Sequence, residues 1–310
     1  MEEPIIRRPE RGTQIRGAIS LILAALLAGC GGGGESEGAA IPAANKILRF
    51  TAIPNQNTTE LKQKFGPVAE YLAQKLGVKV EYVPSIDYAA SREMFKNGEV
   101  HMAWFGGFTG VQARHDVKGG RAIAMGVEDP KFFSYFIAHR ETGLERGDGF
   151  PMGIADLKFT FGSESSTSGR LMPWYFITTM GGKDPRQFFK EQPGFSGAHD
   201  KTAVLVQSGQ YQAGVLDYTV YDRLVGEKKI DPEVCRVIWK TPVYADYNLT
   251  THPEVDKVFG AGFTDRIQAA MIGMTDPKLL AAFGRTGMIA AKNEDFDAIR
   301  EVADGLKMLK

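Results

Sequence analysis

Strand-like and helix-like patterns alternate along this chain from Lys46 onward. The run KILRFTAI reads as a strand, apolar residues between Leu61 and Leu76 recur at steps of three and four as on a helix, and VKVEYV reads as a second strand. A short helix over residues 87–96 and a third strand, VHMAWF, follow. Strands separated by helices pair in parallel with the helices on the sheet faces, so this order predicts an α/β fold.

A second strand–helix series begins near residue 159, and irregular segments over 140–151 and 241–252 flank it. Two α/β units joined by two crossings predict two lobes with a ligand between them, beyond the carboxyl ends of the strands. We expect a signal peptide over 1–30, a flexible tether over 31–45, a first lobe over 46–139 and 250–310, and a second lobe over 140–249.

The charge balance argues against a nucleic-acid partner, and residue spacing argues against a metal site or a nucleotide site. Lys+Arg and Asp+Glu number 37 each, so no global field would recruit nucleic acid. The five histidines are scattered without metal-ligand spacing, and no lysine follows the glycine of the Ser/Thr-rich stretch as a phosphate-binding loop requires. We therefore expect no nucleic-acid partner, no metal and no cofactor.

The N-terminus has the pattern of an export signal. Four arginines precede an apolar run over 18–27 that is too short to span a bilayer. The quartet ending in Cys30, Leu-Ala-Gly-Cys, resembles the bacterial lipoprotein signal, which implies that Cys30 is acylated. The only other cysteine, Cys235, lies in an apolar run and is expected to be a core thiol.

The stretch FTFGSESSTSGRL, which begins at Phe159, runs from a strand into a cluster of hydroxyls at a helix start. A single serine there would be an ordinary helix cap. Consecutive hydroxyls at Ser166, Thr167 and Ser168 exceed what capping requires, and free backbone N–H groups add to them. Because helix N-termini bind oxyanions, this stretch predicts an anion site.

Several motifs resemble the phosphate/phosphite/phosphonate-binding family of ABC-transporter substrate-binding proteins over roughly residues 47–300. They are Asp87-Tyr88-Ala89-Ala90, Ala103-Trp104-Phe105-Gly106-Gly107, Ser166-Thr167-Ser168-Gly169 and Gly197-Ala198-His199-Asp200. The IPNQNTT and WFGGFTGVQAR stretches are more similar to a subgroup labelled as selenate-binding receptors. The resemblance implies a two-lobed periplasmic-binding-protein clamshell of type II with two crossover strands.

The resemblance also implies a set of ligand-binding residues. Ser166, Thr167 and Ser168 would donate to the oxyanion, with His199 from the second lobe and Tyr88 from the first. The remaining members are Phe105, Gly106 and Asp246, the last matching the family's acidic residue after Trp239-Lys240-Thr241-Pro242.

Two positions depart from the family pattern. Phe105 stands where tyrosine is frequent in the family, and the acidic residue that its aminophosphonate binders have near Thr219 is absent, which disfavours 2-aminoethylphosphonate. Asp217 and Tyr218 either face the cleft or begin a helix, and Trp104 reads as a core residue.

We expect a monomeric, lipid-anchored extracytoplasmic receptor that passes a phosphonate, phosphite or phosphate to the permease and ATPase subunits of an ABC importer. A receptor for selenate or sulfate with the same fold is the first alternative. A hydrolase that uses Ser168 or Ser166 with His199 is less favoured, because no G-x-S-x-G elbow is present. A membrane sensor domain would need a signalling segment, and the chain ends in a plain helical pattern at Lys310.

Overall fold

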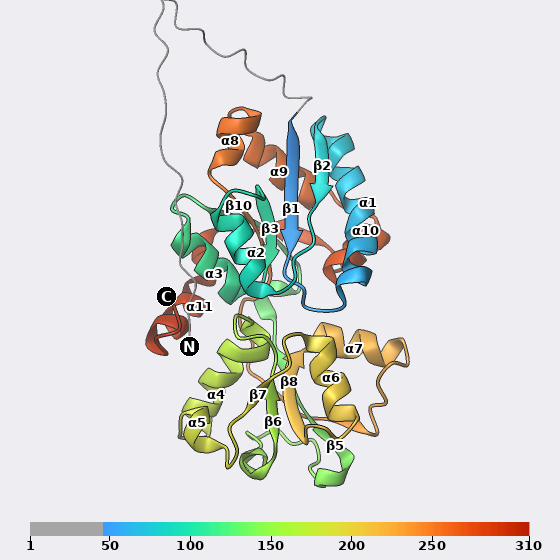
Figure 1. Ribbon diagram of the computed structural model, residues 1–310, viewed down its shortest axis with the longest axis vertical. Coiled ribbons are helices and arrows are strands. Elements are labelled where there is room, and N and C mark those ends of the chain that lie inside the picture. Colours follow the sequence, from blue (N-terminus) through green and yellow to red (C-terminus); the bar gives the residue numbers. More distant parts are fainter. Residues whose placement is uncertain (1–45, 310) are drawn as a thin grey trace, which may run out of the picture. The chain divides into compact units, whose positions relative to one another are not determined.

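The computed structural model describes residues 46–309, which are built around two β-sheets (Figure 1). The first sheet has the strand order β11 (Met288–Ala290), β4 (Arg121–Gly126), β10 (Asn248–Thr251), β3 (Met102–Phe105), β1 (Ile47–Ala52), β2 (Lys79–Tyr82). The second sheet has the order β7 (Gly194–Phe195), β6 (Phe159–Phe161), β8 (Ala213–Asp217), β5 (Ser134–His139), β9 (Cys235–Lys240). We call each sheet with its packed helices a lobe.

Helices cover the faces of both sheets. In the first lobe they are α1 (Thr58–Leu76), α2 (Tyr88–Lys96), α3 (Gly107–Asp116), α8 (Glu254–Phe259), α9 (Phe263–Ile272), α10 (Pro277–Phe283) and α11 (Asp297–Gly305). In the second they are α4 (Met172–Met180), α5 (Pro185–Phe188), α6 (His199–Gln207) and α7 (Tyr218–Gly226). Within residues 46–309, no helix combines the length and the apolar character needed to cross a bilayer.

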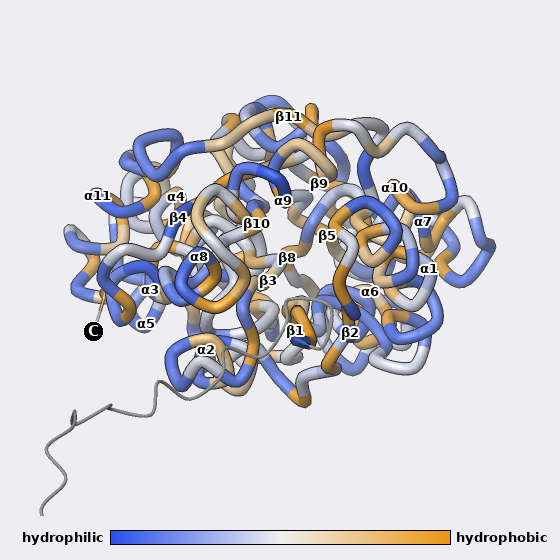
Figure 2. Tube along the Cα trace, turned by 90° about the horizontal axis from the view of Figure 1, so that it is seen from above, coloured by the Kyte–Doolittle hydropathy of each residue, from blue (hydrophilic) through white to orange (hydrophobic). Residues whose placement is uncertain are grey.

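Local sequence signals set the first helix as predicted. The Asn57 side chain accepts hydrogen bonds from the backbone N–H groups of Thr59 and Glu60, and Gly77 ends α1 with a left-handed φ of 70°. One face of α1, from Leu61 to Leu76, is buried. Figure 2 shows hydrophilic and hydrophobic segments alternating along the outer helices, as expected for helices that bury one face.

The predicted parallel pairing is confirmed for the first three strands, since β1 pairs in parallel with β2 and with β3. In the second sheet β6 pairs in parallel with β7 and β8, whereas β10 pairs antiparallel with β3 and β4, and β5 pairs antiparallel with β8 and β9. The short strands β7, β10 and β11 were not predicted, because two to four residues are too few to show a clear period.

The chain crosses between the sheets over residues 127–133 and again over 241–247. Phe132 and Tyr244 form a two-way backbone bridge that joins the crossings, with N···O distances of 2.9 Å. The expected lobe boundary at residues 139 and 140 differs from this, because it assigns β5 to the first lobe. The polar segment 140–151 is a connection within the second lobe, whereas the true first crossing is partly apolar and contains the fully buried Phe132.

Candidate functional site

The hydroxyl-rich stretch forms the start of a long helical segment in the second lobe. Ser166 is its cap, and the Ser166 Oγ accepts a hydrogen bond of 2.9 Å from the Gly169 N–H. The segment opens with one wide turn over Thr167–Leu171 and continues as α4. The first N–H groups of a helix lack intrahelical partners, so those of Thr167 and Ser168 remain available to an anion. Ser168 is a buried residue, and its hydroxyl makes no hydrogen bond with any described residue.

The loop after β3 packs against this helix start. The Phe108 N–H donates to the Thr167 Oγ1 at 2.9 Å, and the Gly107 N–H donates to the Asp246 Oδ1 at 2.9 Å. A Cβ added at Gly106 would lie 3.0 Å from the Thr167 Oγ1 and 3.2 Å from the Asp246 Oδ1. This close approach at Gly106 brings three distant segments of the chain together.

Phe105 lies just before this loop, but its ring packs into the first lobe. The ring meets Phe95 edge-on, with the centroids 5.6 Å apart and the planes at 80°, and it is fully buried. Its contacts are those of a core residue, whereas Gly106 provides the close approach to Thr167 and Asp246.

His199, at the start of α6, has one ring nitrogen engaged and one free. Its Nδ1 accepts a hydrogen bond of 3.3 Å from the Asp217 N–H, and its buried Nε2 has no partner among the described residues. Burial lowers the pKa of His199, so the neutral ring is favoured. With Nδ1 accepting, the proton of the neutral ring is on Nε2, which makes this atom a hydrogen-bond donor. The ring lies beside the helix start, because a Cβ at Gly169 would be 3.0 Å from its Cε1.

Asp246 and Tyr88 each contribute one unpartnered polar atom, in addition to the Nε2 of His199. The Asp246 Oδ2 is buried without a partner among residues 46–309, and burial raises the pKa of this carboxyl to about 7. The Tyr88 hydroxyl, at the start of α2, is likewise buried and unpartnered. Burial, with the charges of Asp217 and Asp246, raises the pKa of Tyr88 well above its usual value, and the Ser166 side chain opposes that rise. Tyr88 therefore keeps its hydrogen and is a donor.

These three atoms come from distant parts of the chain and meet around one helix start. Buried polar groups are nearly always hydrogen-bonded, so a cluster of unpaired ones indicates a missing partner. Two of them are donors and one is a carboxylate oxygen, which suits an oxyanion that itself carries an O–H group. The structure thus brings together all the predicted polar side chains: Tyr88, Ser166, Thr167, Ser168, His199 and Asp246.

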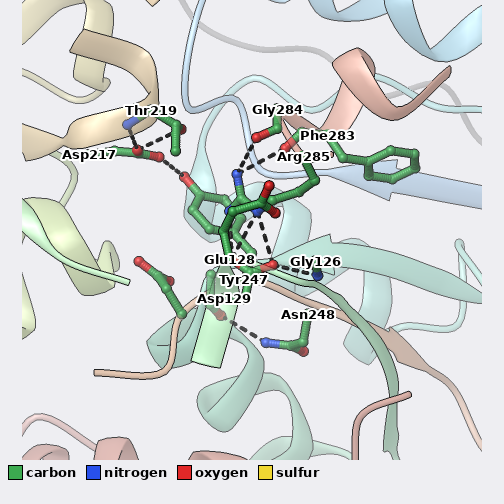
Figure 3. A network of polar contacts seen from close by, with 12 residues as sticks. Gly126, Glu128, Asp129, Asp217, Thr219, Tyr247, Asn248, Phe283, Gly284 and Arg285 are labelled. Carbon is green, nitrogen blue, oxygen red and sulfur yellow. Dashed lines mark hydrogen bonds and ion pairs between the residues drawn. The ribbon is translucent and has the colours of Figure 1, made fainter. Parts of the chain in front are cut away.

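A polar network missed by the sequence reasoning supports this site (Figure 3). Arg285 binds Asp129 through two nitrogens at 2.6 to 3.0 Å, and both side chains are almost fully buried. The Asp129 carbonyl accepts the Asp246 N–H at 3.1 Å, and its Oδ2 accepts the Gly126 N–H at 2.6 Å. Burial raises the pKa of Asp129 to about 6 while Arg285 opposes a larger rise, so the ion pair persists at neutral pH. No local motif marks this pair in the sequence.

The contacts of Asp217 decide between the two roles left open for it, facing the cleft or beginning a helix. Its Oδ1 accepts the N–H and the hydroxyl of Thr219, both at 2.7 Å, and its Oδ2 accepts the Tyr247 hydroxyl at 3.0 Å (Figure 3). Asp217 therefore caps α7, as one reading held. The Tyr218 ring stacks on Phe133, with the centroids 3.8 Å apart.

In the described part of the chain, no group of three or more His, Cys, Asp or Glu side chains is placed to hold a metal ion. Cys235 is a buried thiol whose pKa burial raises to about 12. Cys30 lies outside the described residues.

Comparison with known proteins points to one family. A profile described as ABC transporter, phosphonate, periplasmic substrate-binding protein matches residues 50–296. The probable ABC transporter phosphite binding protein PhnD1 of Prochlorococcus marinus is 32% identical over 272 residues, covering 86% of this chain and 91% of that protein. The phosphate-import protein PhnD of Mycolicibacterium smegmatis is 24% identical over 306 residues, covering 91% of this chain and 92% of that protein.

The fold has a close counterpart among solved structures. PhnD1 of Prochlorococcus marinus in complex with methylphosphonate superposes with a TM-score of 0.80 at 33% identity, covering 85% of this chain and 99% of that chain. A phosphonate-transporter binding protein of Pseudomonas aeruginosa, 20% identical, superposes with a TM-score of 0.72 over 83% of this chain and 85% of that one, which supports the fold alone.

Proposed function

This chain belongs to the ABC-transporter family of phosphonate periplasmic substrate-binding proteins, and on that premise we propose that it captures a small tetrahedral oxyanion between its two lobes. The family is extracytoplasmic, and the relatives are transport receptors. Phosphite, phosphate and methylphosphonate appear in the names of the relatives, and we propose the same class of ligand here. The observation that carries the proposal is the cluster of unpartnered polar atoms on Tyr88, His199 and Asp246.

Each side of the oxyanion has a partner in this arrangement. The N–H groups of Thr167 and Ser168 and the Ser168 hydroxyl would bind oxygens at the positive end of the helix dipole. The Tyr88 hydroxyl and the His199 Nε2–H would donate to the remaining oxygens. The Asp246 Oδ2 would accept a hydrogen bond from the O–H group of a singly protonated ligand. The ligand and the carboxylate would then share one proton.

The closed arrangement of the lobes depends on bonds made beside the ligand. The His199 N–H donates across the lobes to the Asn55 carbonyl at 3.0 Å, and the Thr109 hydroxyl donates to the Ser165 carbonyl at 2.7 Å. Ligand contacts from Tyr88 in one lobe and from Ser168 in the other would add to these bonds. Binding would therefore favour closure, as expected when a ligand makes more contacts in one state.

The site favours a ligand with a small, uncharged substituent. Asp217 would be a counter-ion for a ligand amine, but Thr219 and Tyr247 already occupy its oxygens. We therefore expect methylphosphonate and phosphite to bind better than 2-aminoethylphosphonate.

A selenate or sulfate receptor remains the second candidate, and the raised pKa of Asp246 supports keeping it. A fully deprotonated anion needs a donor at every contact. With its pKa at about 7, Asp246 is protonated in part of the neutral population and in that form donates instead of repelling. The resemblance to selenate-binding receptors stays a prediction.

We propose binding and release without turnover. A hydrolase would need His199 to take the proton of Ser168. In the neutral ring the Nε2 already carries the proton and the Nδ1 accepts the Asp217 N–H, so neither nitrogen is free to act as that base.

Membrane attachment through Cys30 completes the proposal, which includes a monomeric receptor that delivers its ligand to ABC permease and ATPase subunits. Acylation would hold the receptor beside the permease, with residues 31–45 as a tether. Wild-type protein should incorporate radiolabelled fatty acid, and Cys30→Ser should abolish the label. Failure of the wild type to take up label would remove the anchor.

Calorimetry tests the ligand class. Phosphite, methylphosphonate, phosphate, sulfate and selenate would each be titrated into the protein, with small-angle scattering before and after. We expect one phosphorus oxyanion per chain, recovered unchanged, and a smaller radius of gyration on binding. No compaction with any of these anions, together with phosphate-ester hydrolysis lost in Ser168→Ala, would support the enzyme instead.

A further inference from the structure

A cavity of about 530 Å³ lies between the lobes. We call it the α1–α7 cavity. Helices α1 and α10 of the first lobe contribute Leu61, Phe65 and Leu280, and α7 of the second lobe contributes Val220 and Arg223. Its volume falls within the range of small-molecule sites, roughly 300 to 1,000 Å³.

This cavity is separate from the oxyanion site. None of the residues assigned to the oxyanion lines it. Tyr247 separates the two: its ring stacks on Trp104 with the centroids 5.8 Å apart, and its hydroxyl accepts a hydrogen bond of 2.9 Å from the Asn55 side chain. Trp104 and Asn55 line the cavity, whereas Tyr247 is next to Asp246 in the sequence and fully buried.

The cavity has an aromatic wall and a cationic rim. Phe283 meets Phe65 and Trp104 edge-on, with centroid distances of 5.2 and 5.0 Å. Lys64 and Arg223 also line the cavity, and among the described residues that line it there is no carboxylate. Arg285 reaches it too, but its guanidinium is already bound to Asp129.

The Lys64 ammonium is poorly compensated. Its one hydrogen bond with a described residue is a long contact of 3.4 Å to the Gln56 Oε1. Burial lowers the pKa of Lys64 and the charge of Arg223 lowers it further, while the Glu60 and Glu227 carboxylates oppose this only in part. Arg223 itself pairs with Glu227, the residue that ends α7, at 2.8 Å, and lies 4.0 Å from the Glu60 carboxylate of α1. An anion between Lys64 and Arg223 would relieve this repulsion.

We propose that the α1–α7 cavity is a second ligand site, which takes a small amphipathic anion with an aromatic body and a carboxylate. The aromatic body lies against Phe65, Trp104 and Phe283, and the carboxylate lies between Lys64 and Arg223. This site goes beyond the proposed oxyanion function and does not depend on it.

The position of the two cations gives the site a consequence for closure. Lys64 is on α1 and Arg223 is on α7, so an anion that contacts both joins the lobes. It favours the closed arrangement and so tightens oxyanion binding, with equal coupling in the other direction. This coupling, unlike the site itself, rests on the proposed function.

Calorimetry with 2-naphthoate tests the site, and neutral 2-naphthalenemethanol is its matched control ligand. We expect one naphthoate per chain, at least tenfold weaker binding of the alcohol, and several-fold weaker naphthoate binding in Lys64→Gln and in Arg223→Gln. Lys62→Gln, an exposed lysine on the same helix that does not line the cavity, should bind naphthoate as the wild type does. Ala281→Trp, an exposed position at the cavity, should abolish binding by filling it.

The outcomes separate this site from the oxyanion site. Naphthoate binding that survives Ala281→Trp, or that Lys62→Gln weakens as much as Lys64→Gln does, overturns the proposal. Displacement of naphthoate by methylphosphonate in simple competition also overturns it, because the two would then share one site. A wild type that binds naphthoate in the cavity but none of the phosphorus or sulfur oxyanions refutes the proposed function and leaves this site standing.

Discussion

Asp246→Asn separates the two classes of oxyanion most directly. The Asp246 Oδ1 accepts the Gly107 N–H at 2.9 Å, and the carbonyl oxygen of asparagine can keep that bond. The unpartnered Oδ2 is then replaced by an NH₂ group. The substitution keeps the shape of the side chain and turns an acceptor that faces the site into a donor.

The size of the effect follows from the group left unpaired. A singly protonated phosphonate loses the acceptor for its buried O–H, which costs about 1 to 3 kcal/mol. That corresponds to a rise of about 5- to 150-fold in Kd. Sulfate and selenate lose no acceptor and gain a donor, so their affinity should stay unchanged or increase.

The dependence on pH gives an independent readout. Burial raises the pKa of Asp246 to about 7, so the carboxyl gains charge as the pH rises through that value. Sulfate binding to the wild type should therefore weaken above pH 7, whereas the asparagine variant should show no such step. The raised pKa also means that Asp246 contributes stability to the ligand-free wild type below its ordinary pKa of 3.8, and that this contribution is lost as the pH rises through about 7.

Calorimetry with methylphosphonate, phosphite, sulfate and selenate, well below and well above pH 7, measures these effects. Asp297→Asn, at an exposed ion pair far along the chain, is the matched control. Methylphosphonate affinity that is untouched by Asp246→Asn would refute the reasoning. Tight selenate binding by a wild type that ignores the phosphorus oxyanions would refute the ligand class as well.

Three further substitutions test other parts of the site. His199→Asn keeps an acceptor for the Asp217 N–H but loses the Nε2–H donor. In calorimetry it should weaken methylphosphonate binding about 10- to 150-fold, which is the value of a hydrogen bond to a charged group. Unchanged affinity would exclude that donor. Gly106→Ala adds a methyl 3.0 Å from the Thr167 Oγ1 and should weaken binding by about 1 to 3 kcal/mol, whereas Gly149→Ala, with no atom within 4 Å, should have no effect. Arg285→Met leaves Asp129 buried and unpaired and should lower the free energy of unfolding in urea by about 3 to 5 kcal/mol. The double variant with Asp129→Leu should regain most of that stability. A double variant no more stable than Arg285→Met alone would contradict the ion pair as the cause.

The sequence predicted the features that depend on neighbouring residues. The helical period between Leu61 and Leu76 is a local signal, and α1 is present there, with Asn57 as its cap and Gly77 at its end. The Ser166 cap and the free N–H groups of Thr167 and Ser168 follow from the same local chemistry. The family resemblance added His199, Asp246 and Tyr88, which no local pattern connects.

Features that depend on distant residues were not predicted. Asp129 and Arg285 are 156 positions apart, and nothing around either one indicates a buried pair. The first crossing was expected in the polar segment after residue 139, because glycine-rich polar stretches usually mark connections between lobes. The actual crossing contains Asp129 and Phe132, whose burial depends on Arg285 and Tyr244 from other parts of the chain.

The hydrogen bond from the His199 N–H to the Asn55 carbonyl has a kinetic consequence, because it closes the lobes over a buried site. Under the proposed function, a ligand held there would leave only after this bond and the Thr109 bond to Ser165 have broken. Its residence time would therefore be limited by how often the lobes separate. The association rate would likewise be reduced in proportion to the fraction of molecules that are open at a given moment. Two oxyanions of very different affinity would share the same upper limit on their rate of release, and a transporter that pries the lobes apart would accelerate the release of both.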